Sequence, residues 1–309
     1  MPLVNDVQSR VNQTEVREIV APRSVEEIHR ALERASEESL AISVAGGRHS
    51  MGAQQFGTGN LHLDLSEYRG IVDFDRSRGI IEVESGIMWP ELIRYLHENQ
   101  QGSETVWAVR QKQTGIDNVS IGGSLASNIH GRGLKFPPFI SDIDSFRILD
   151  HAGNQLRCCR TEHSELFSLA IGGYGLFGVV THVSLRLVPR QVVKRMVEVI
   201  AVRNLIPRIE AAVEEGFLYG DCQYSIDLSG DEEFHPGVFS CYKPVPDDTP
   251  VPEQRKQMAG SDWAALYRLA RTDKARAFSQ YEQFYLGTSG QVYWSDAHQL
   301  SNVFEGYNE

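Results

Sequence analysis

The stretch "ISVAGGRHSMGAQQFG", residues 42–57, combines a short strand, a glycine pair and a histidine. Its first residues predict a strand that ends at Gly46 and Gly47. Glycines at a strand end indicate a backbone that approaches a ligand or another segment closely. Arg48, His49 and Ser50 follow at once. The histidine is then a spectator, a metal ligand, a base or a point of covalent attachment.

The composition is that of an ordinary globular protein. The chain has 309 residues, which is enough for one large domain or two ordinary domains. Its formal net charge of −11 disfavours general binding of nucleic acid or anionic membrane, because both need a positive field. The four cysteines follow neither a disulfide framework nor a C-x-x-C zinc pattern, and the histidines lack metal-binding spacing. We therefore expect no metal site.

Targeting signals are not apparent in the sequence. The first residues lack the charged-then-apolar pattern of a signal peptide, and no apolar run approaches the roughly 20 residues of a membrane span. The expected location is the cytoplasm, and the expected partner is a small molecule.

Strands and helices are predicted in alternation up to about residue 190. One helix is predicted to begin at Ser24, which forms the pattern of a capping box with Glu27. Hairpins are predicted over residues 70–86 and 145–159. Near residue 190 the pattern changes to longer strands, helices and a proline-rich loop, so we predict a domain boundary there.

Three stretches of small residues, 46–52, 120–133 and 173–180, lie between regular elements. The last one contains a literal G-x-G-x-x-G in "GGYGLFG", but a nicotinamide site needs a strand before these glycines and a helix after them. Here a predicted helix precedes the glycines and a predicted strand follows, which disfavours a Rossmann site. Glycine-rich turns present consecutive backbone N–H groups to an anion. Together the stretches line a long diphosphate-containing ligand, or they merely end strands and helices.

The segments "AGGRHSMG", "SIGGSLASNIHGRG" and "GGYGLFGVVTHVSLRL" resemble the flavin-contacting segments of the vanillyl-alcohol-oxidase family of FAD-linked oxidases. The nearest resemblance is to sugar, polyol and aldonolactone oxidases and to decaprenylphosphoryl-ribose oxidase, over residues 14–190. It implies an α+β fold. Residues 1–190 would form a PCMH-type FAD-binding domain of two α/β subdomains, and residues 191–309 would form an α+β substrate domain.

The resemblance also implies which residues contact FAD. The first segment would wrap the diphosphate, the second would run beside the diphosphate, ribose and flavin, and Val179 or Val180 would contact the adenine end. The implied cofactor-binding residues are Gly46, Gly47, Arg48, His49, Ser50, Met51, Gly115, Ser120, Gly122, Gly123, Ser127, Ile129, His130, Val179 and Val180.

Two histidines occupy positions that the family uses. In its covalent flavoproteins, a histidine just after the loop glycines is bonded to the flavin 8α-methyl carbon, and His49 corresponds to that histidine. Such a bond would tether FAD and raise its reduction potential. The alternative is a hydrogen bond from His49 to a phosphate. His130 corresponds to a histidine that positions the flavin, although a structural role fits it as well.

The implied function is oxidation of a CH–OH group of a sugar, polyol or lactone by hydride transfer to flavin N5, with reoxidation by O2 or another acceptor. The alternatives are a flavin reductase of the enolpyruvyl-sugar type and a truncated, non-catalytic flavin-binding module. Tyr224, Tyr242, Tyr293 and Trp294 are candidates to stack on sugar rings, although aromatic residues more often belong to a core. Family members continue beyond the point where this chain ends, so we expect an incomplete substrate domain, and no catalytic base is assigned.

Overall fold

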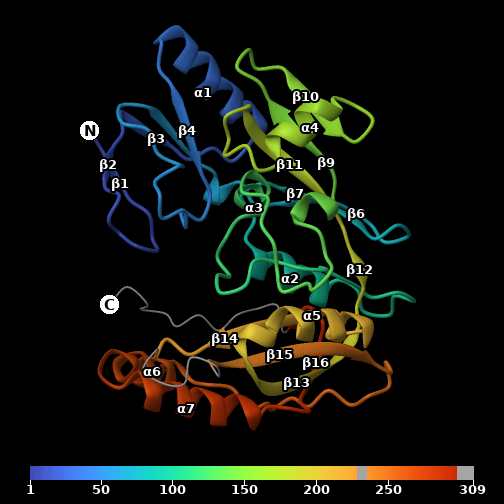
Figure 1. Ribbon diagram of the computed structural model, residues 1–309. Helices are drawn as coiled ribbons and strands as arrows, with labels where there is room; N and C mark the ends of the chain where they lie inside the picture. Colours follow the sequence, from blue (N-terminus) through green and yellow to red (C-terminus); the bar gives the residue numbers. More distant parts are fainter. Residues whose placement is uncertain (228–234, 298–309) are drawn as a thin grey trace. The chain divides into compact units, whose positions relative to one another are not determined.

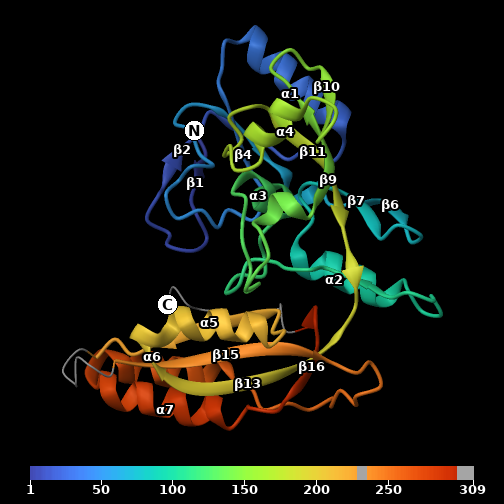
Figure 2. The same cartoon turned by 45° about the vertical axis from the view of Figure 1, so that its right-hand side comes forward.

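The computed structural model describes residues 1–227 and 235–297 (Figures 1 and 2). The chain divides into two compact units. The first comprises Met1–Gly131 and Pro137–Pro189, and the second comprises Arg132–Phe136 and the described residues from 190 to 297. Both contain helices and sheets, which confirms the predicted mixed class. No sequence pattern marks the excursion of residues 132–136 into the second unit.

A three-stranded parallel sheet of order β3-β5-β4 begins the first unit. Its strands are β3 (Glu18–Val20), β4 (Ile42–Ala45) and β5 (Leu61–Asp64), and α1 (Val25–Glu37) connects β3 to β4. The strands β1 (Leu3–Val4) and β2 (Thr14–Glu15) form a preceding hairpin. The side chain of Ser24 accepts the N–H of Glu27 at 3.2 Å, so α1 begins as predicted. The Glu27 carboxylate accepts the N–H of Arg23 at 2.7 Å, one residue before the position that a capping box requires.

A five-stranded antiparallel sheet of order β10-β9-β11-β7-β6 follows in the first unit. Its strands are β6 (Ile71–Asp75), β7 (Ile80–Glu84), β9 (Ile143–Leu149), β10 (Gln155–Cys159) and β11 (Val179–Arg186). The other elements of this unit are α2 (Trp89–Glu98), α3 (Ile121–Ala126), α4 (Ser164–Ala170), η1 (Leu65–Glu67), η2 (Phe139–Ser141), β8 (Trp107–Ala108) and β12 (Val188–Pro189). Both predicted hairpins are confirmed. The third glycine stretch lies between α4 and β11, which confirms the order of helix, glycines and strand.

A shared core joins the two sheets of the first unit. Ile28 of α1 packs in one cluster with Leu149 and Val179 of the five-stranded sheet. Tyr68 belongs to the same cluster and is 1% exposed. Its hydroxyl group lies 3.0 Å from Nε2 of His182 on β11, so a buried hydrogen bond reinforces the apolar contact between the sheets.

The second unit contains a four-stranded antiparallel sheet of order β14-β15-β13-β16. Its elements are β13 (Val192–Ala201), η3 (Val202–Asn204), α5 (Leu205–Glu214), β14 (Tyr219–Tyr224), β15 (Pro236–Val245), α6 (Gly260–Thr272), α7 (Lys274–Leu286) and β16 (Val292–Trp294). Figures 1 and 2 show α5 on one face of this sheet and α6 with α7 on the other. Leu134 packs in the cluster beneath α5, and Phe136 packs in the cluster on the opposite face. Residues 132–136 therefore contribute to the core of the second unit.

The buried His182 predicts that acid destabilises the first unit. Burial, and then the charge of Arg147, lower the pKa of His182 from 6.5 to about 4. Between these two pH values the unfolded chain binds a proton that the folded chain excludes. We expect full stability above pH 6.5 and a progressive loss as the pH falls towards 4. His182→Gln should weaken that loss, measured by urea unfolding at about pH 7 and about pH 5. Equal losses in both proteins would contradict this role.

Candidate functional site

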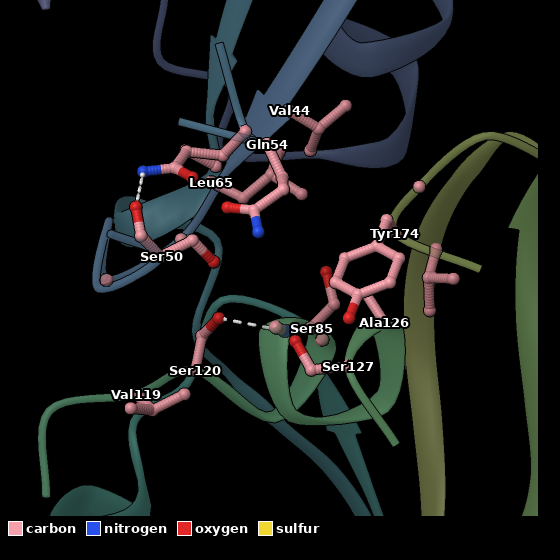
Figure 3. A pocket seen from close by; sticks show the side chains of 18 of the residues that line it. Val44, Ser50, Gln54, Leu65, Ser85, Val119, Ser120, Ala126, Ser127 and Tyr174 are labelled. Atoms are coloured by element: carbon pink, nitrogen blue, oxygen red, sulfur yellow. Dashed lines mark hydrogen bonds between the residues drawn. The ribbon is translucent and has the colours of Figure 1, made fainter. Parts of the chain in front are cut away.

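A pocket of about 390 Å³ lies in the first unit, between the end of β4, the loop leading into α3 and the loop before β11 (Figure 3). Pockets for small molecules and cofactors commonly measure about 300–1,000 Å³. The structure brings most of the predicted cofactor-binding residues together here. The predicted residues that line the pocket are Gly46, Gly47, Arg48, His49, Ser50, Met51, Ser120, Gly122, Gly123, Ser127, Ile129 and Val180.

Three predicted residues lie elsewhere. Val179 is 3% exposed and packs in the core cluster, whereas Val180 faces the pocket, because successive strand residues point to opposite faces. His130 is exposed, and its Nδ1 lies 3.2 Å from the carbonyl oxygen of Gly131. Gly115 occupies a left-handed position with φ of +87° in the loop before α3 and does not line the pocket.

Several residues that line the pocket were not predicted from the sequence. Gln54 and Gln55 line the pocket, and Nε2 of Gln55 donates to the carbonyl oxygen of Ser50 at 3.1 Å. Both glutamines lie in the stretch 42–57, and this nearness to the predicted cofactor-binding loop was the signal that could have identified them. Tyr174 also lines the pocket, with its ring on the same side as Ser127 in Figure 3. Its left-handed φ of +51° is unusual for a bulky side chain.

The paired glycines allow two loops to pack against each other. A Cβ atom added to Gly47 would lie 2.2 Å from the carbonyl oxygen of Asn118, and one added to Gly46 would lie 2.1 Å from Oγ of Ser120. Such distances are impossible without a shift of the backbone at Asn118. The glycines are thus required by contact between the loops, while the loops themselves line the pocket.

Backbone N–H groups at the start of α3 are hydrogen-bonded within the protein. Oγ of Ser120 accepts the N–H of Gly123 at 3.1 Å, as Figure 3 shows. The N–H of Gly122 donates to the carbonyl oxygen of Ser85 at 2.7 Å. A side chain at Gly122 would collide with Ser85, since its Cβ would lie 2.8 Å from Cβ of Ser85. The α3 segment therefore contributes a smooth, glycine-rich surface to the pocket.

His49 presents one unsatisfied nitrogen. Its Nδ1 is buried and has no hydrogen-bond partner among the described residues. Burial lowers the pKa of His49, and a hydrogen bond to the backbone carbonyl of Asn118 and the charge of Asp6 oppose that effect only in part. The imidazole is therefore neutral at neutral pH. Nδ1 is the ring nitrogen that is left without a hydrogen-bond partner within the described residues.

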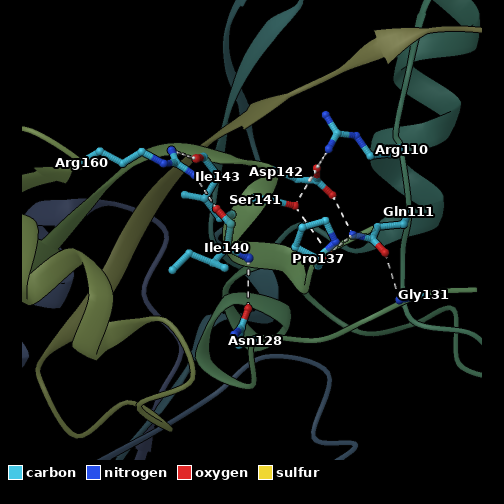
Figure 4. Close-up of polar contacts among 10 residues, drawn as sticks. All are labelled: Arg110, Gln111, Asn128, Gly131, Pro137, Ile140, Ser141, Asp142, Ile143 and Arg160. Atoms are coloured by element: carbon cyan, nitrogen blue, oxygen red, sulfur yellow. Dashed lines mark hydrogen bonds and ion pairs between the residues drawn. The ribbon is translucent and has the colours of Figure 1, made fainter. Parts of the chain in front are cut away.

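A polar network holds the loop that follows α3 (Figure 4). Oδ1 of Asn128 accepts the N–H of Ile140 at 3.0 Å. The buried amide of Gln111 donates to the carbonyl oxygen of Pro137 at 2.8 Å and accepts the N–H of Gly131 at 3.3 Å. Gln111 thus holds both ends of the excursion formed by residues 132–136.

An ion pair supports the same network. Arg110 lies 3.2 Å from Asp142, whose other carboxylate oxygen accepts the amide of Gln111 at 3.2 Å. Burial raises the pKa of Asp142, and the charge of Arg110 opposes that effect. The network therefore fixes the backbone around Ser127 and Ile129, which line the pocket.

Comparison with known proteins identifies this part of the chain. Residues 16–159 match the family model described as an FAD binding domain. The chain carries an FAD-binding domain. This match confirms the resemblance to FAD-linked oxidases and the predicted cofactor, and it spans the glycine loops before and within α3.

The relatives of this FAD-binding domain are oxidoreductases. An uncharacterized oxidoreductase from the fasciation locus of Rhodococcoides fascians is 28% identical over 169 residues, which cover 55% of this chain and 37% of that protein. The L-gulonolactone oxidase of Scyliorhinus torazame is 27% identical over 54% of this chain and 36% of its own length. The chain thus spans little more than a third of these relatives.

A solved structure shares the fold. The alkyldihydroxyacetonephosphate synthase in P1 superposes with a TM-score of 0.61 at 16% identity, covering 74% of this chain and 48% of that chain. This likeness supports the PCMH-type fold of the FAD-binding domain.

The residues present in the pocket fit FAD. The orphaned Nδ1 of His49 indicates a missing partner, because buried polar atoms are normally bonded. Arg48 supplies a positive charge for a diphosphate, and the lining also includes apolar residues such as Val44 and Leu65 for flat rings. Within residues 1–227 and 235–297, no group of three or more His, Cys, Asp or Glu side chains is arranged to hold a metal ion. None of the described helices combines the length and apolar character that a membrane span requires.

The four candidate stacking residues of the second unit differ in exposure. Tyr242 is 2% exposed and belongs to the core, where its ring packs edge-on against Tyr293. Trp294 lies beneath the guanidinium group of Arg190, 4.4 Å from its ring centroid. Tyr224 is 53% exposed and alone among the four is an exposed large side chain. The core role that aromatic residues usually have therefore applies to Tyr242.

Gly47→Ala should disrupt the FAD site. The added Cβ meets a backbone carbonyl, so the loop must shift and FAD binding should weaken at least about tenfold. Gly102→Ala is the control, because its φ of +77° strains alanine without any collision and Gly102 lies outside the pocket. It therefore reproduces a general loss of stability and leaves the site unchanged. The measurement is the ratio of flavin to protein absorbance after desalting. Equal flavin content in both variants would show that this contact does not shape the site.

Proposed function

We propose that the protein is an FAD-dependent oxidoreductase that oxidises a CH–OH group of a small hydroxylated substrate, such as a sugar, polyol or lactone. The carrying observation is the pocket of the FAD-binding domain with the orphaned Nδ1 of His49. The similarity to a gulonolactone oxidase supports the substrate class. Bound FAD supplies the acceptor for a hydride from the carbon that bears the hydroxyl group.

The residues of this chain bind and orient the cofactor. Loop 46–51 and the glycine-rich start of α3 form the walls, and the buried contact between Gly47 and Asn118 keeps them together. His49 lines the pocket, and its buried Nδ1 has no hydrogen-bond partner among the described residues. The second unit is proposed to contact the substrate, with exposed Tyr224 as the aromatic candidate. The electron acceptor is proposed to be O2 or another oxidant.

Substrate reduction of the flavin tests this function. Under anaerobic conditions, sugars, polyols or lactones should bleach the visible flavin absorbance of the holoprotein, because reduction of FAD removes that absorbance. Phenols and amines serve as negative controls, and a nicotinamide dinucleotide tests the reductase alternative. Bleaching by the nicotinamide alone would favour a reductase, and no bleaching by any donor would favour a non-catalytic module.

We further propose that His49 holds FAD covalently through Nδ1. Burial lowers the pKa of the imidazole and so favours its neutral form, and Nδ1 has no hydrogen-bond partner among the described residues, so Nδ1 is the proposed nucleophile. The bond would join Nδ1 to the 8α-methyl carbon of FAD, which would lose one C–H bond. The two electrons would stay on the flavin until O2 or the other proposed acceptor removes them. A phosphate contact would instead need a proton on the nitrogen of His49 that faces it, because phosphate oxygens accept hydrogen bonds, whereas attachment needs the lone pair of that nitrogen.

Acid precipitation distinguishes these alternatives. The wild-type protein should keep its flavin in the acid pellet, whereas His49→Ala should release it to the supernatant and should be reduced more slowly by substrate. His130→Ala is the matched control, because His130 is exposed and outside the pocket, and it should keep the flavin in the pellet. Release of all flavin from the wild-type protein would end the covalent proposal while leaving FAD binding untouched.

A further inference from the structure

A second set of contacts holds the loop that carries His49, and it comes from the N-terminal hairpin. Residues 5–12 connect β1 to β2 and do not line the pocket. The N–H of Val7 donates to the carbonyl oxygen of Arg48 at 3.0 Å, and the side-chain amide of Asn12 donates to the carbonyl oxygen of Met51. These two carbonyls lie on either side of His49 and Ser50 in the chain. Residues 5–12 therefore hold this dipeptide from both ends.

Asp6 organises residues 5–12. Its side chain is buried, at 1% exposure. Oδ1 accepts the N–H groups of Ser9 and, at 3.2 Å, Arg10, while Oδ2 accepts the amide of Asn12 at 2.9 Å. Burial raises the pKa of this carboxyl, but the hydrogen bonds outweigh burial and lower the pKa of Asp6 from 3.8 to about 2. Asp6 is thus charged at neutral pH and orients the amide that reaches Met51.

The loop needs support of this kind. Arg48 has a left-handed φ of +54°, a conformation that side-chain-bearing residues adopt only when their surroundings impose it. Its own carbonyl oxygen is the one that Val7 binds. The contacts of Asp6 with Ser9 and Arg10 are enough to stabilise the turn itself. The contact of Asp6 with Asn12 instead transmits order to the loop around His49.

We propose that residues 5–12 are a clamp that orders loop 46–51 for FAD, with Asp6 as its central positioning residue. This inference rests on the proposed placement of FAD along loop 46–51. A loop ordered in advance loses less conformational freedom when a ligand binds, so the clamp increases the affinity for FAD. It also fixes the backbone on both sides of His49, which lines the pocket.

Asp6→Asn removes the contact of residue 6 with Asn12 and keeps the turn that residue 6 forms with Ser9 and Arg10. The amide retains an oxygen for the N–H groups of Ser9 and Arg10, but it places an NH2 group against the NH2 group of Asn12. Two donors cannot bond to each other, so Asn12 loses the partner that directs it towards Met51.

Asp150→Asn is the matched control. In the hairpin between β9 and β10, Asp150 accepts the N–H groups of Ala152 at 2.8 Å and Asn154 at 2.9 Å, and the Asn154 amide at 3.0 Å. Asp150 is more exposed than Asp6, but it accepts the same kinds of donor, two backbone N–H groups and one asparagine amide, and it does not line the pocket.

The readout is the rate of flavin release after dilution, followed by the gain in flavin fluorescence. All variants carry His49→Ala, so that no covalent bond hides the release. We expect Asp6→Asn to release FAD about tenfold faster and Asp150→Asn to release it at the unchanged rate. Amide hydrogen exchange of residues 47–51 should also accelerate in Asp6→Asn alone. Thermal unfolding of both variants controls for general loss of stability.

A double variant tests the route through Asn12. With Asp6→Asn and Asn12→Asp together, position 6 donates to position 12 and the turn is restored, but the carboxylate has no N–H for Met51. Release should stay fast. Slow release from this double variant, or equal release from Asp6→Asn and Asp150→Asn, would overturn the clamp. If acid releases the flavin from the wild-type protein, that result contradicts only the covalent bond to His49 and not the clamp.

Discussion

The FAD-binding domain depends on the close approach of two loops that are far apart in the sequence. Gly47 meets the carbonyl of Asn118 so closely that a single methyl group would separate them. The backbone of Asn118 also acts on His49, because it partly opposes the effect of burial, which lowers the pKa of that imidazole. One peptide group at Asn118 thus contributes both to the shape of the pocket wall and to the surroundings of His49. Elements further away, such as the Asp6 turn and the Gln111 network, keep these loops in place.

The chemistry of the pocket follows from burial more than from charge. Its lining contains many glycine, serine and apolar residues, with Arg48 as the cation among the lining residues that the structure describes. A buried imidazole in such surroundings is neutral, and a neutral imidazole offers a lone pair where a charged one offers only protons. A lysine at position 49 would give a positive charge instead. The histidine is therefore suited to attachment or to accepting a hydrogen bond, both of which need the lone pair.

Local patterns predicted the hairpins, the start of α1 and the reversed order around the third glycine stretch. These features depend on side-chain alternation and capping within a few residues. The choice of Val180 over Val179 required the strand register relative to the pocket, which alternation alone leaves open. The roles of Gln54, Gln55 and Tyr174 required knowledge of which loops meet, since the pocket that they line is built from segments far apart in the chain. The sequence predicted the glycine-rich lining more completely than the other lining residues, because glycine spacing is local and loop contacts are not.

The excursion of residues 132–136 limits how the chain can be divided. Leu134 and Phe136 pack in the clusters on the two faces of the second unit's sheet, although they lie more than 50 residues before that sheet begins. A protein expressed from residue 190 onwards would lack both side chains and would expose two apolar holes. The first unit expressed alone would carry a loop with unpaired apolar residues. Recombination that exchanges the second unit between related genes therefore has to exchange residues 132–136 together with the C-terminal part. The two units are then inherited together.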